Sequence, residues 1–395
     1  MKIAIVVHGR FHAFDLAREL LKRGHDVTLF TNYPKRVAEQ FGIPRQHVRT
    51  LLFHGALSRV SWWIHKTLGF PYPEAFLHRM FGAWISREIR HEIWDVVHAW
   101  SGISEEVRIS NKGEIGLKLL MRGSAHIRIQ AQILREEEER VGKKIDCPSP
   151  WMIAREEREY ELTDKIIVLS RFALKSFIRQ GVPSEKLRLL PLGVNTQIFR
   201  PSISVIEERC RRIVSGEPLR VLYVGAVSFR KGMWDLKQII GRLSGGRFKF
   251  RLVGEIEQNF SSFAKELASE QTKFLGKQSQ HKLPKQYEWS DLFIFPTLED
   301  GFAAVLMQAS AASLPILVTE NCGAPDFVRP DETGWILPIR SPEAFVERLL
   351  WCDSHREELA QMVLKIYHKF RPRDWSDVAR DFERICEEGM KKSGN

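Results

Sequence analysis

The stretch KIAIVVHGRFHAFDLARELLKRGHDVTLFT, residues 2–31, decides the fold class of this chain. Its first six residues form a short apolar run typical of a buried strand, and Gly9 follows as a turn residue. The segment AFDLARELLKRG then places apolar side chains at helical spacing, and Gly24 ends the predicted helix before a second strand, DVTLFT. Strand, helix and strand in this order form a βαβ unit, which predicts a parallel sheet.

The same pattern continues along the chain. WDVVHA, GLKLLM and DKIIVLS predict three more strands, and Ser170 is expected to cap the helix RFALKSFIRQG. After a Pro-, Gly- and Asn-containing passage around residues 191–217, a second series follows with the strands LRVLYVG, FKFRLVG, TKFLG, DLFIFPT and LPILVT. We therefore expect an α/β chain with parallel-sheet domains at 1–200 and 201–372 and an amphipathic C-terminal helix at 373–395.

Composition narrows the class of protein. The 395 residues carry a formal net charge of +11, which favours contact with anions such as nucleotide phosphates, acidic membranes or nucleic acid. The five cysteines contain no Cys-x-x-Cys pair, which argues against a disulfide framework or structural zinc and predicts a reducing, cytoplasmic location. No apolar run approaches the length of a membrane span, and the apolar start is too short for a signal peptide.

In open parallel sheets, ligands bind beyond the carboxyl ends of the strands, so the residues after each strand are candidates for a site. VGAVSFRKG, residues 224–232, places Arg230 and Lys231 where a phosphate would meet the first amides of a helix. A solvated basic loop is the alternative interpretation.

A second candidate is EDGFAAVLMQASA, residues 299–311. Acids at a helix start complement the helix dipole, so a simple helix cap explains them without any ligand. The functional interpretation is that Asp300 or Glu299 accepts hydrogen bonds from ligand hydroxyls, while the amides of Phe302 and Ala303 face the same ligand. Gln308, about two turns further on, would lie near the same face and suits a sugar or ribose better than a core.

These passages, in this order, resemble the family-four retaining glycosyltransferases, and the resemblance covers nearly the whole chain. DKIIVLSRFALKSFIRQGVPSEKLRLLPLGVNTQIFRP, VGAVSFRKG, FLGKQSQHKLPKQYEWSDLFIFPTLEDGF and CGAPDFVRPDETGWILP each look like a passage of that family. The resemblance implies a GT-B fold: two Rossmann-like domains that face a cleft, with the C-terminal helix crossing back to the first domain.

The resemblance also implies roles for single residues. Arg230 and Lys231 would hold the donor diphosphate, so that no metal is needed. Asp300 aligns with the first acid of the family's two-acid motif, with Glu299 as the alternative, and Gln308 aligns with the second acid, which contacts ribose. The implied donor-binding residues are Gly225, Arg230, Lys231, Lys277, Glu299, Gly301, Phe302, Ala303 and Gln308; the implied catalytic residues are His126 and Asp300; Gly9 and Arg122 lie on the acceptor side.

Four departures from the family pattern favour a second interpretation. Gln308 stands for glutamate, Ala226 for arginine and Ala303 for glycine, and the first loop has only Gly9 where two glycines are common. The alternative to an active enzyme is thus a catalytically weakened GT-B protein that binds a glycan or a partner.

Several features of the first domain remain open. His126 is expected either near the reacting sugar or as a helix cap, His98 is expected to be structural, and Ser124 is expected to cap the following helix. EEEER, residues 136–140, predicts a solvated helix face. Residues 40–73 lack acids but contain arginines and two tryptophans, which indicates either an anionic membrane contact or, slightly favoured, a buried aromatic helix.

The resulting expectation is a metal-independent, retaining glycosyltransferase without a cofactor. It would move a hexosyl unit from a UDP- or GDP-sugar to a glycan or lipid-linked acceptor. A nucleic-acid binder is disfavoured because no binding motif accompanies the charge, and a dehydrogenase because no Gly-x-Gly-x-x-Gly follows a predicted strand.

Overall fold

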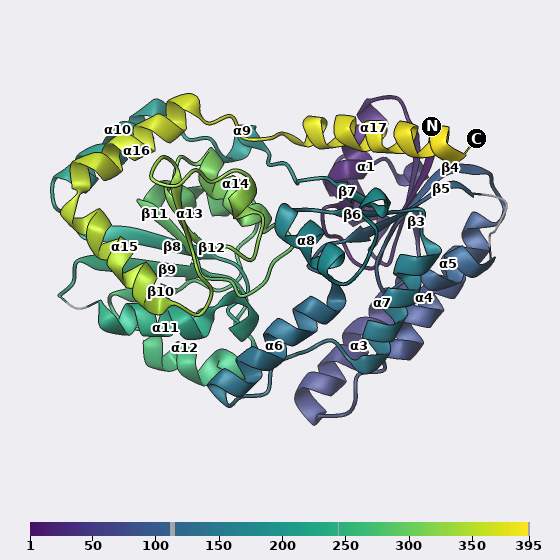
Figure 1. Ribbon diagram of the computed structural model, residues 1–395, viewed down its shortest axis with the longest axis horizontal. Helices are drawn as coiled ribbons and strands as arrows, with labels where there is room; N and C mark the ends of the chain where they lie inside the picture. The colour runs from purple at the N-terminus through teal and green to yellow at the C-terminus, as the bar shows by residue number, and fades with distance from the viewer. Residues whose placement is uncertain (111–114, 244, 394–395) are drawn as a thin grey trace.

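The computed structural model describes residues 1–110, 115–243 and 245–393, and it contains two parallel sheets (Figure 1). The first has seven strands in the order β3-β2-β1-β4-β5-β6-β7. Its elements are β1 (Lys2–Val7), α1 (Ala13–Lys22), β2 (Asp26–Thr31), α2 (Lys35–Gln40), β3 (Val48–Thr50), α3 (Leu52–Leu68), α4 (Glu74–Ile89), β4 (Trp94–Trp100), α5 (Glu105–Ser110), β5 (Ile115–Arg122), α6 (Ile127–Val141), α7 (Pro150–Leu162), β6 (Lys165–Val168), α8 (Arg171–Arg179) and β7 (Leu187–Leu189).

The second sheet has six strands in the order β10-β9-β8-β11-β12-β13. The rest of the chain contains α9 (Thr196–Phe199), α10 (Ile203–Val214), β8 (Leu219–Val224), η3 (Phe229–Lys231), α11 (Met233–Arg242), β9 (Phe248–Val253), α12 (Ser261–Leu267), β10 (Thr272–Phe274), α13 (Leu283–Trp289), β11 (Leu292–Phe295), α14 (Ala304–Ala311), β12 (Ile316–Thr319), β13 (Gly334–Leu337), α15 (Pro342–Ser354), α16 (Arg356–Lys369) and α17 (Trp375–Ser393).

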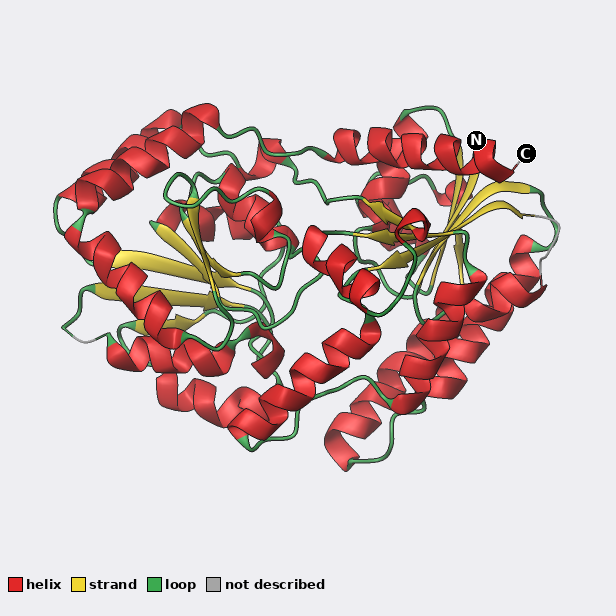
Figure 2. Ribbon diagram, viewed as in Figure 1, coloured by secondary structure: helices red, strands yellow, loops and turns green. Residues whose placement is uncertain are grey.

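The two sheets share one topology, because each runs outward over three strands and then returns to continue on the other side of its first strand. Neighbouring strands are parallel throughout; Ile3 pairs with Val96, and Val221 pairs with Leu292. Helices cover both faces of each sheet (Figure 2). The predicted α/β class with two Rossmann-like sheets is confirmed, and the predicted cap by Ser170 is present, since its side chain accepts from the amide of Ala173.

Three strands at the sheet edges were not predicted. β3, β7 and β13 have only three or four residues each. Such short segments carry too few alternating positions to show a period, and their pairing with a longer neighbour makes them strands.

The C-terminal helix α17 crosses back to the first domain, as expected, and packs on α1 and β5 (Figure 1). Gly389 lies so close to Leu117 that an added Cβ would be 2.6 Å from a leucine methyl. Glu383 accepts from Arg23 and lies 2.5 Å from a ring nitrogen of His25. Packing and ion pairs therefore join the last helix to the first domain.

Helix α6 joins the two domains, which corrects the prediction of a solvated EEEER face. Glu137 is fully buried, and its carboxylate pairs with Arg140 and with Arg340 of the second domain at 3.2 Å. Arg340 also pairs with Glu136 at 2.8 Å, and Arg140 pairs with Asp235 of α11 at 2.7 Å. We call these five residues the α6 seam. The second domain covers a face that sequence alone assigns to solvent.

Helix α3 is more exposed than the sequence predicts. The interpretation of α3 as a buried aromatic helix is wrong, because only His54 and Gly55 of its seventeen residues are buried. Trp62 and Trp63 are 48% and 58% exposed. The helix packs at its first turn and its remaining length faces solvent.

Candidate functional site

A cleft of about 550 Å³ lies between the two domains. Its walls come from the carboxyl ends of strands in both sheets. His8 follows β1, Trp100 ends β4, Gly225 follows β8 and Phe295 ends β11. These four strands flank the two points at which the strand order reverses, where doubly wound folds bind their ligands.

Lys231 and Asp300 form a buried ion pair on the second-domain wall of this cleft. Lys231 is 6% exposed, and its burial beside Arg230 lowers its pKa. Burial opposes ionisation of Asp300, but the charges of Lys231 and Arg230 outweigh it and lower the pKa of that carboxyl. Asp300 is therefore an anion at neutral pH and is held against two cations.

The amides of Phe302 and Ala303 do not face a ligand, which corrects an expectation. Both donate to Oδ1 of Asp300, at 3.0 and 2.6 Å. Ala303 adopts φ 60°, a left-handed conformation that is costly for any residue with a Cβ. Ala303 thus keeps the left-handed backbone that the family's glycine would adopt, at the cost of strain.

Two glycines let chain segments meet at the cleft. A Cβ on Gly232, which has φ 72°, would overlap the carbonyl oxygen of Pro296. A Cβ on Gly301 would overlap the carbonyl oxygen of Gly123 across the domain boundary. Only glycine allows these approaches.

Glu299 has a different position from Asp300. It is fully buried, and its carboxylate accepts from the Ser124 hydroxyl, from the amide of Ala125 at 2.9 Å and from Gln130 at 3.2 Å, all in the first domain. Arg230 lies 3.4 Å from Oε2 of Glu299, the oxygen that also accepts from Gln130. Of the two predicted acids, Asp300 lines the cleft, and Glu299 bridges the domains. Ser124 serves this bridge and not the expected helix cap.

Arg122 lines the cleft from the end of β5. Its guanidinium lies 3.0 Å from the Glu156 carboxylate and donates to Gln130 at 2.7 Å. Burial disfavours its charge, but Glu156 and its other neighbours raise the pKa of Arg122. Arg122 is therefore a fixed cation on the first-domain wall, opposite Arg230 and Lys231.

Three histidines that the sequence did not single out also line the first-domain wall, namely His8, His12 and His78. Burial, with the rings of His78 and His54, lowers the pKa of His8 to about 3; burial also lowers the pKa of His12 to about 3 and lowers that of His78. The wall thus presents neutral imidazoles. His8 could have been found from its place directly after a predicted strand, whereas His78 on α4 has no local signal.

His126 caps α6 and does not line the cleft. Its Nδ1 accepts from the amide of Arg128 at 3.2 Å, and its ring lies 5.0 Å from the rings of Tyr160 and Phe177. Burial lowers its pKa to about 4. Of the two interpretations of His126, the structure therefore agrees with the helix cap. His98 is fully buried in β4 against Trp100, as a structural histidine would be.

Other predicted residues lie near the cleft or away from it. Gly9 does not line the cleft, and its amide donates to the side chain of Asn32 at 2.9 Å. Gln308 does not line the cleft; its side-chain oxygen accepts from the hydroxyl of Tyr287 at 2.9 Å. Lys277 is also outside the cleft, with its side chain 80% exposed and 3.8 Å from Glu255.

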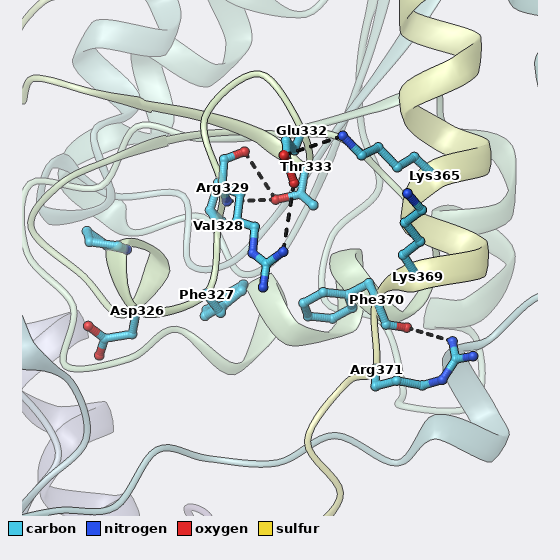
Figure 3. Close-up of a pocket in the computed structure, with 11 residues that line it drawn as sticks. Asp326, Phe327, Val328, Arg329, Glu332, Thr333, Lys365, Lys369, Phe370 and Arg371 are labelled. Atoms are coloured by element: carbon cyan, nitrogen blue, oxygen red, sulfur yellow. Dashed lines mark hydrogen bonds and ion pairs between the residues drawn. The ribbon is translucent and has the colours of Figure 1, made fainter.

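A second cavity, of about 540 Å³, lies within the second domain between the loop around Phe327 and the end of α16 (Figure 3). Its Glu332 pairs with Arg329 and Lys365 at 3.8 and 3.5 Å. None of the predicted site residues lines it. The cleft between the domains is therefore the candidate functional site.

Comparisons with known proteins agree with this architecture. The family "Glycosyltransferase Family 4" matches residues 10–198, and "Glycosyl transferases group 1" matches residues 206–368. The amylovoran biosynthesis glycosyltransferase AmsK of Erwinia amylovora is 23% identical over 52% of this chain and 52% of its own length. A lipopolysaccharide 1,2-N-acetylglucosaminetransferase of Salmonella typhimurium is 28% identical over 57% of this chain and 63% of its own length. The matches thus span less than two thirds of these relatives.

Solved structures resemble the chain over nearly its full length. HepE of Anabaena, crystallised with UDP and glucose, covers 98% of this chain and all of its own with a TM-score of 0.68 at 15% identity. WaaG, a glycosyltransferase of lipopolysaccharide biosynthesis, covers 97% of this chain and 99% of its own, with a TM-score of 0.67 at 14% identity. These likenesses establish the GT-B fold. The two family matches, which together span residues 10–198 and 206–368, show that the chain belongs to the family-four glycosyltransferases.

Proposed function

We propose that this chain is a retaining glycosyltransferase that moves a hexosyl unit from a nucleoside diphosphate sugar to a glycan or glycolipid acceptor. One observation carries the proposal: Arg122, Arg230 and Lys231 converge on a cleft between the carboxyl ends of two sheets. A diphosphate carries charge that such partly desolvated cations bind strongly.

Charge stabilisation follows from the same geometry. A nucleoside diphosphate gains negative charge as the glycosidic bond breaks, and Lys231 with Arg230 would stabilise that charge. Asp300 would accept hydrogen bonds from hydroxyl groups of the donor sugar, because two backbone amides fix its Oδ1 and Lys231 pairs with its Oδ2 at the wall of the cleft. Metal independence belongs to the proposal, since these side chains would neutralise the leaving group.

The acceptor would approach from the first-domain wall. Arg122 is fixed by Glu156 and Gln130, and neutral His8, His12 and His78 offer ring nitrogens to sugar hydroxyls. The neutral imidazoles suit a hydroxyl acceptor, and Arg122 adds a cation to the same wall. The relatives named for amylovoran biosynthesis and for lipopolysaccharide N-acetylglucosamine transfer support a polysaccharide or glycolipid acceptor. The UDP bound by HepE supports a UDP-sugar donor, and a GDP-sugar is the alternative donor of the proposal. A cytoplasmic location, where such donors are made, completes the proposal.

The experiment is calorimetry of the purified chain with UDP, GDP, ADP and CMP, with and without EDTA. We expect tight, EDTA-insensitive binding of one diphosphate. Lys231→Ala should weaken it roughly tenfold to hundredfold, since a charged hydrogen bond contributes about 1.5–3 kcal/mol. Lys277→Ala is the matched control and should bind normally, because Lys277 lies outside the cleft.

Arg230→Gln provides a second test, because Lys231→Ala leaves Asp300 without its partner and can disturb folding. Arg230 is 37% exposed at its side chain, so this variant should fold and still bind the diphosphate more weakly. Normal binding by both Lys231→Ala and Arg230→Gln would overturn the assignment of the diphosphate site. Retention would be tested by NMR, which assigns the anomeric configuration of the first product formed for comparison with that of the donor sugar.

A second candidate function is a GT-B module that binds without transfer. It is favoured by Gln308, whose amide is engaged by Tyr287, and by the strained Ala303. Diphosphate affinity without sugar transfer or donor hydrolysis would establish it. Gln308→Glu restores the acid of the family motif and should then raise turnover, while an already active enzyme should change its donor affinity only modestly.

A further inference from the structure

An exposed apolar surface runs along α3 and the turn that follows it. We define the α3 face as Phe53, Val60, Trp62, Trp63, Leu68 and Phe70. These six side chains are 48–69% exposed. Of the fourteen large apolar side chains that are exposed among the described residues, eight lie between positions 52 and 76. Single exposed apolar residues are ordinary, whereas a concentration on one element indicates a binding surface.

The face is exposed because the buried residues of α3, His54 and Gly55, both lie in its first turn. His54 lies 3.1 Å from the carbonyl of Leu77, and Gly55 lies so close to the carbonyl of Asn32 that no Cβ would fit. Beyond this turn the helix runs beside α4 at the edge of the first domain (Figure 1). Phe53, Val60 and Trp63 recur at helical spacing and form an apolar stripe along one side of α3, while Trp62 projects from another side of the helix.

The charge around this stripe has one sign. Residues 41–73 contain no aspartate or glutamate. Arg59 and Lys66 are seven positions apart and follow one edge of the stripe. Both cations lie over aromatic rings: Lys66 is 4.5 Å from the ring of Trp62, and Arg59 is 5.6 Å from that of Tyr33. The surface therefore combines tryptophan and phenylalanine with cations that no carboxylate of the same segment neutralises.

We propose that the α3 face docks this protein on an anionic lipid surface. Amphipathic helices with Trp, Phe and Leu on one side and cations at its edge lie in the headgroup region, where the rings meet acyl chains and the cations meet phosphates. No helix among the described residues is long and apolar enough to span a bilayer, so this contact is peripheral. The net charge of +11 adds long-range attraction toward the same surface.

The α3 face also leads to the cleft. His54, at the anchored end of α3, lies 4.9 Å ring to ring from His8, which lines the first-domain wall. Docking would place the acceptor half of the cleft beside the membrane. Resting on the proposed transferase function, this placement favours an acceptor whose sugar is attached to a lipid.

The test is flotation of the full chain with vesicles of phosphatidylcholine and with vesicles that also contain phosphatidylglycerol, without any sugar nucleotide. We expect binding to the anionic vesicles. Arg59→Gln with Lys66→Gln should weaken it about thirtyfold, because each cation near an anionic surface contributes about 1 kcal/mol. Trp63→Ser with Phe70→Ser should weaken it roughly tenfold or more. Ile93→Ser removes a side chain that is 80% exposed elsewhere and should have no effect.

Wild-type binding to neither kind of vesicle, or unchanged binding by both double variants, would overturn the proposal. A wild-type dimer that Trp63→Ser converts to a monomer would overturn it as well, because the face would then cover a second copy. Diphosphate calorimetry on the same preparations separates the two questions: intact diphosphate binding without vesicle binding refutes only membrane docking, and the reverse result refutes only the transferase site.

Discussion

Helices α6 and α3 belong to the same domain, yet each has the surroundings expected of the other. The acidic run on α6 contains a fully buried carboxylate, Glu137, whereas the aromatic α3 exposes Trp62 and Trp63. On α6 the charges meet complementary charges from the second domain. On α3 no other part of the described chain covers the rings beyond the first turn.

The difference shows that burial follows from which element lies opposite, in addition to side-chain polarity. An acid can be buried when several donors surround it, and Glu137 has Arg140 and Arg340. An aromatic ring can remain exposed when the binding it provides outweighs the cost in solubility. The composition of a helix indicates which of its side chains can be buried. The elements that pack against the helix decide which side chains are buried.

The largest effect should come from Glu137→Ala. This variant leaves Arg340 and Arg140 without their shared buried carboxylate, and breaking such a pair costs about 3–5 kcal/mol. Glu139→Ala, two positions away at an exposed site, should change the free energy of unfolding by about 0.5 kcal/mol or less. Urea unfolding of both variants provides the measurement, and equal effects would show that α6 is solvated after all.

A pH effect should arise at the start of α6. Burial lowers the pKa of His126 to about 4, so protons favour the unfolded state and stability falls as the pH drops from 6.5 toward 4. His126→Asn retains a capping side chain without this titration and should reduce the loss by up to about 3 kcal/mol. Parallel pH profiles for wild type and His126→Asn would contradict the prediction.

A moderate effect is expected from Arg340→Lys. The guanidinium donates to Glu136, Glu137 and the carbonyl of Ile133 at once, and one ammonium group cannot reproduce that fork. We expect a loss of about 1–2 kcal/mol in thermal or urea unfolding. Arg59→Lys on α3 is the matched substitution and should be neutral for stability. A neutral Arg340→Lys would mean that the seam needs only charge.

The smallest effect on folding should come from Trp63→Ser on α3. The ring is more than half exposed, so unfolding should change by about 0.5 kcal/mol or less. Phe81→Ala on the neighbouring α4 is a fitting contrast, because Phe81 is fully buried and its loss should cost about 3–5 kcal/mol. A large destabilisation by Trp63→Ser would show that α3 packs more extensively than its exposure indicates.

The candidate site could be predicted from sequence only where its residues are local to one strand end. Gly225, Arg230, Lys231 and Asp300 follow strands of the second domain, and all four line the cleft. Gln308 was predicted from helical spacing and from the family resemblance, and its side chain turns toward Tyr287. Lys277 was implied by the resemblance, and its side chain turns toward solvent. The direction of a side chain depends on neighbours that helical or strand spacing does not specify.

Periodicity and turn residues, which act over a few positions, predict the two parallel sheets, the amphipathic helix at the C-terminus and the basic loop at 224–232. The crossing of that helix to the first domain was implied only by the family resemblance. The tertiary structure alone decided that Glu299 bridges the domains, that His78 reaches the cleft, that Glu137 is buried and that Trp63 is not. Each of these depends on contacts between segments far apart in the chain, and local spacing carries no information about such contacts.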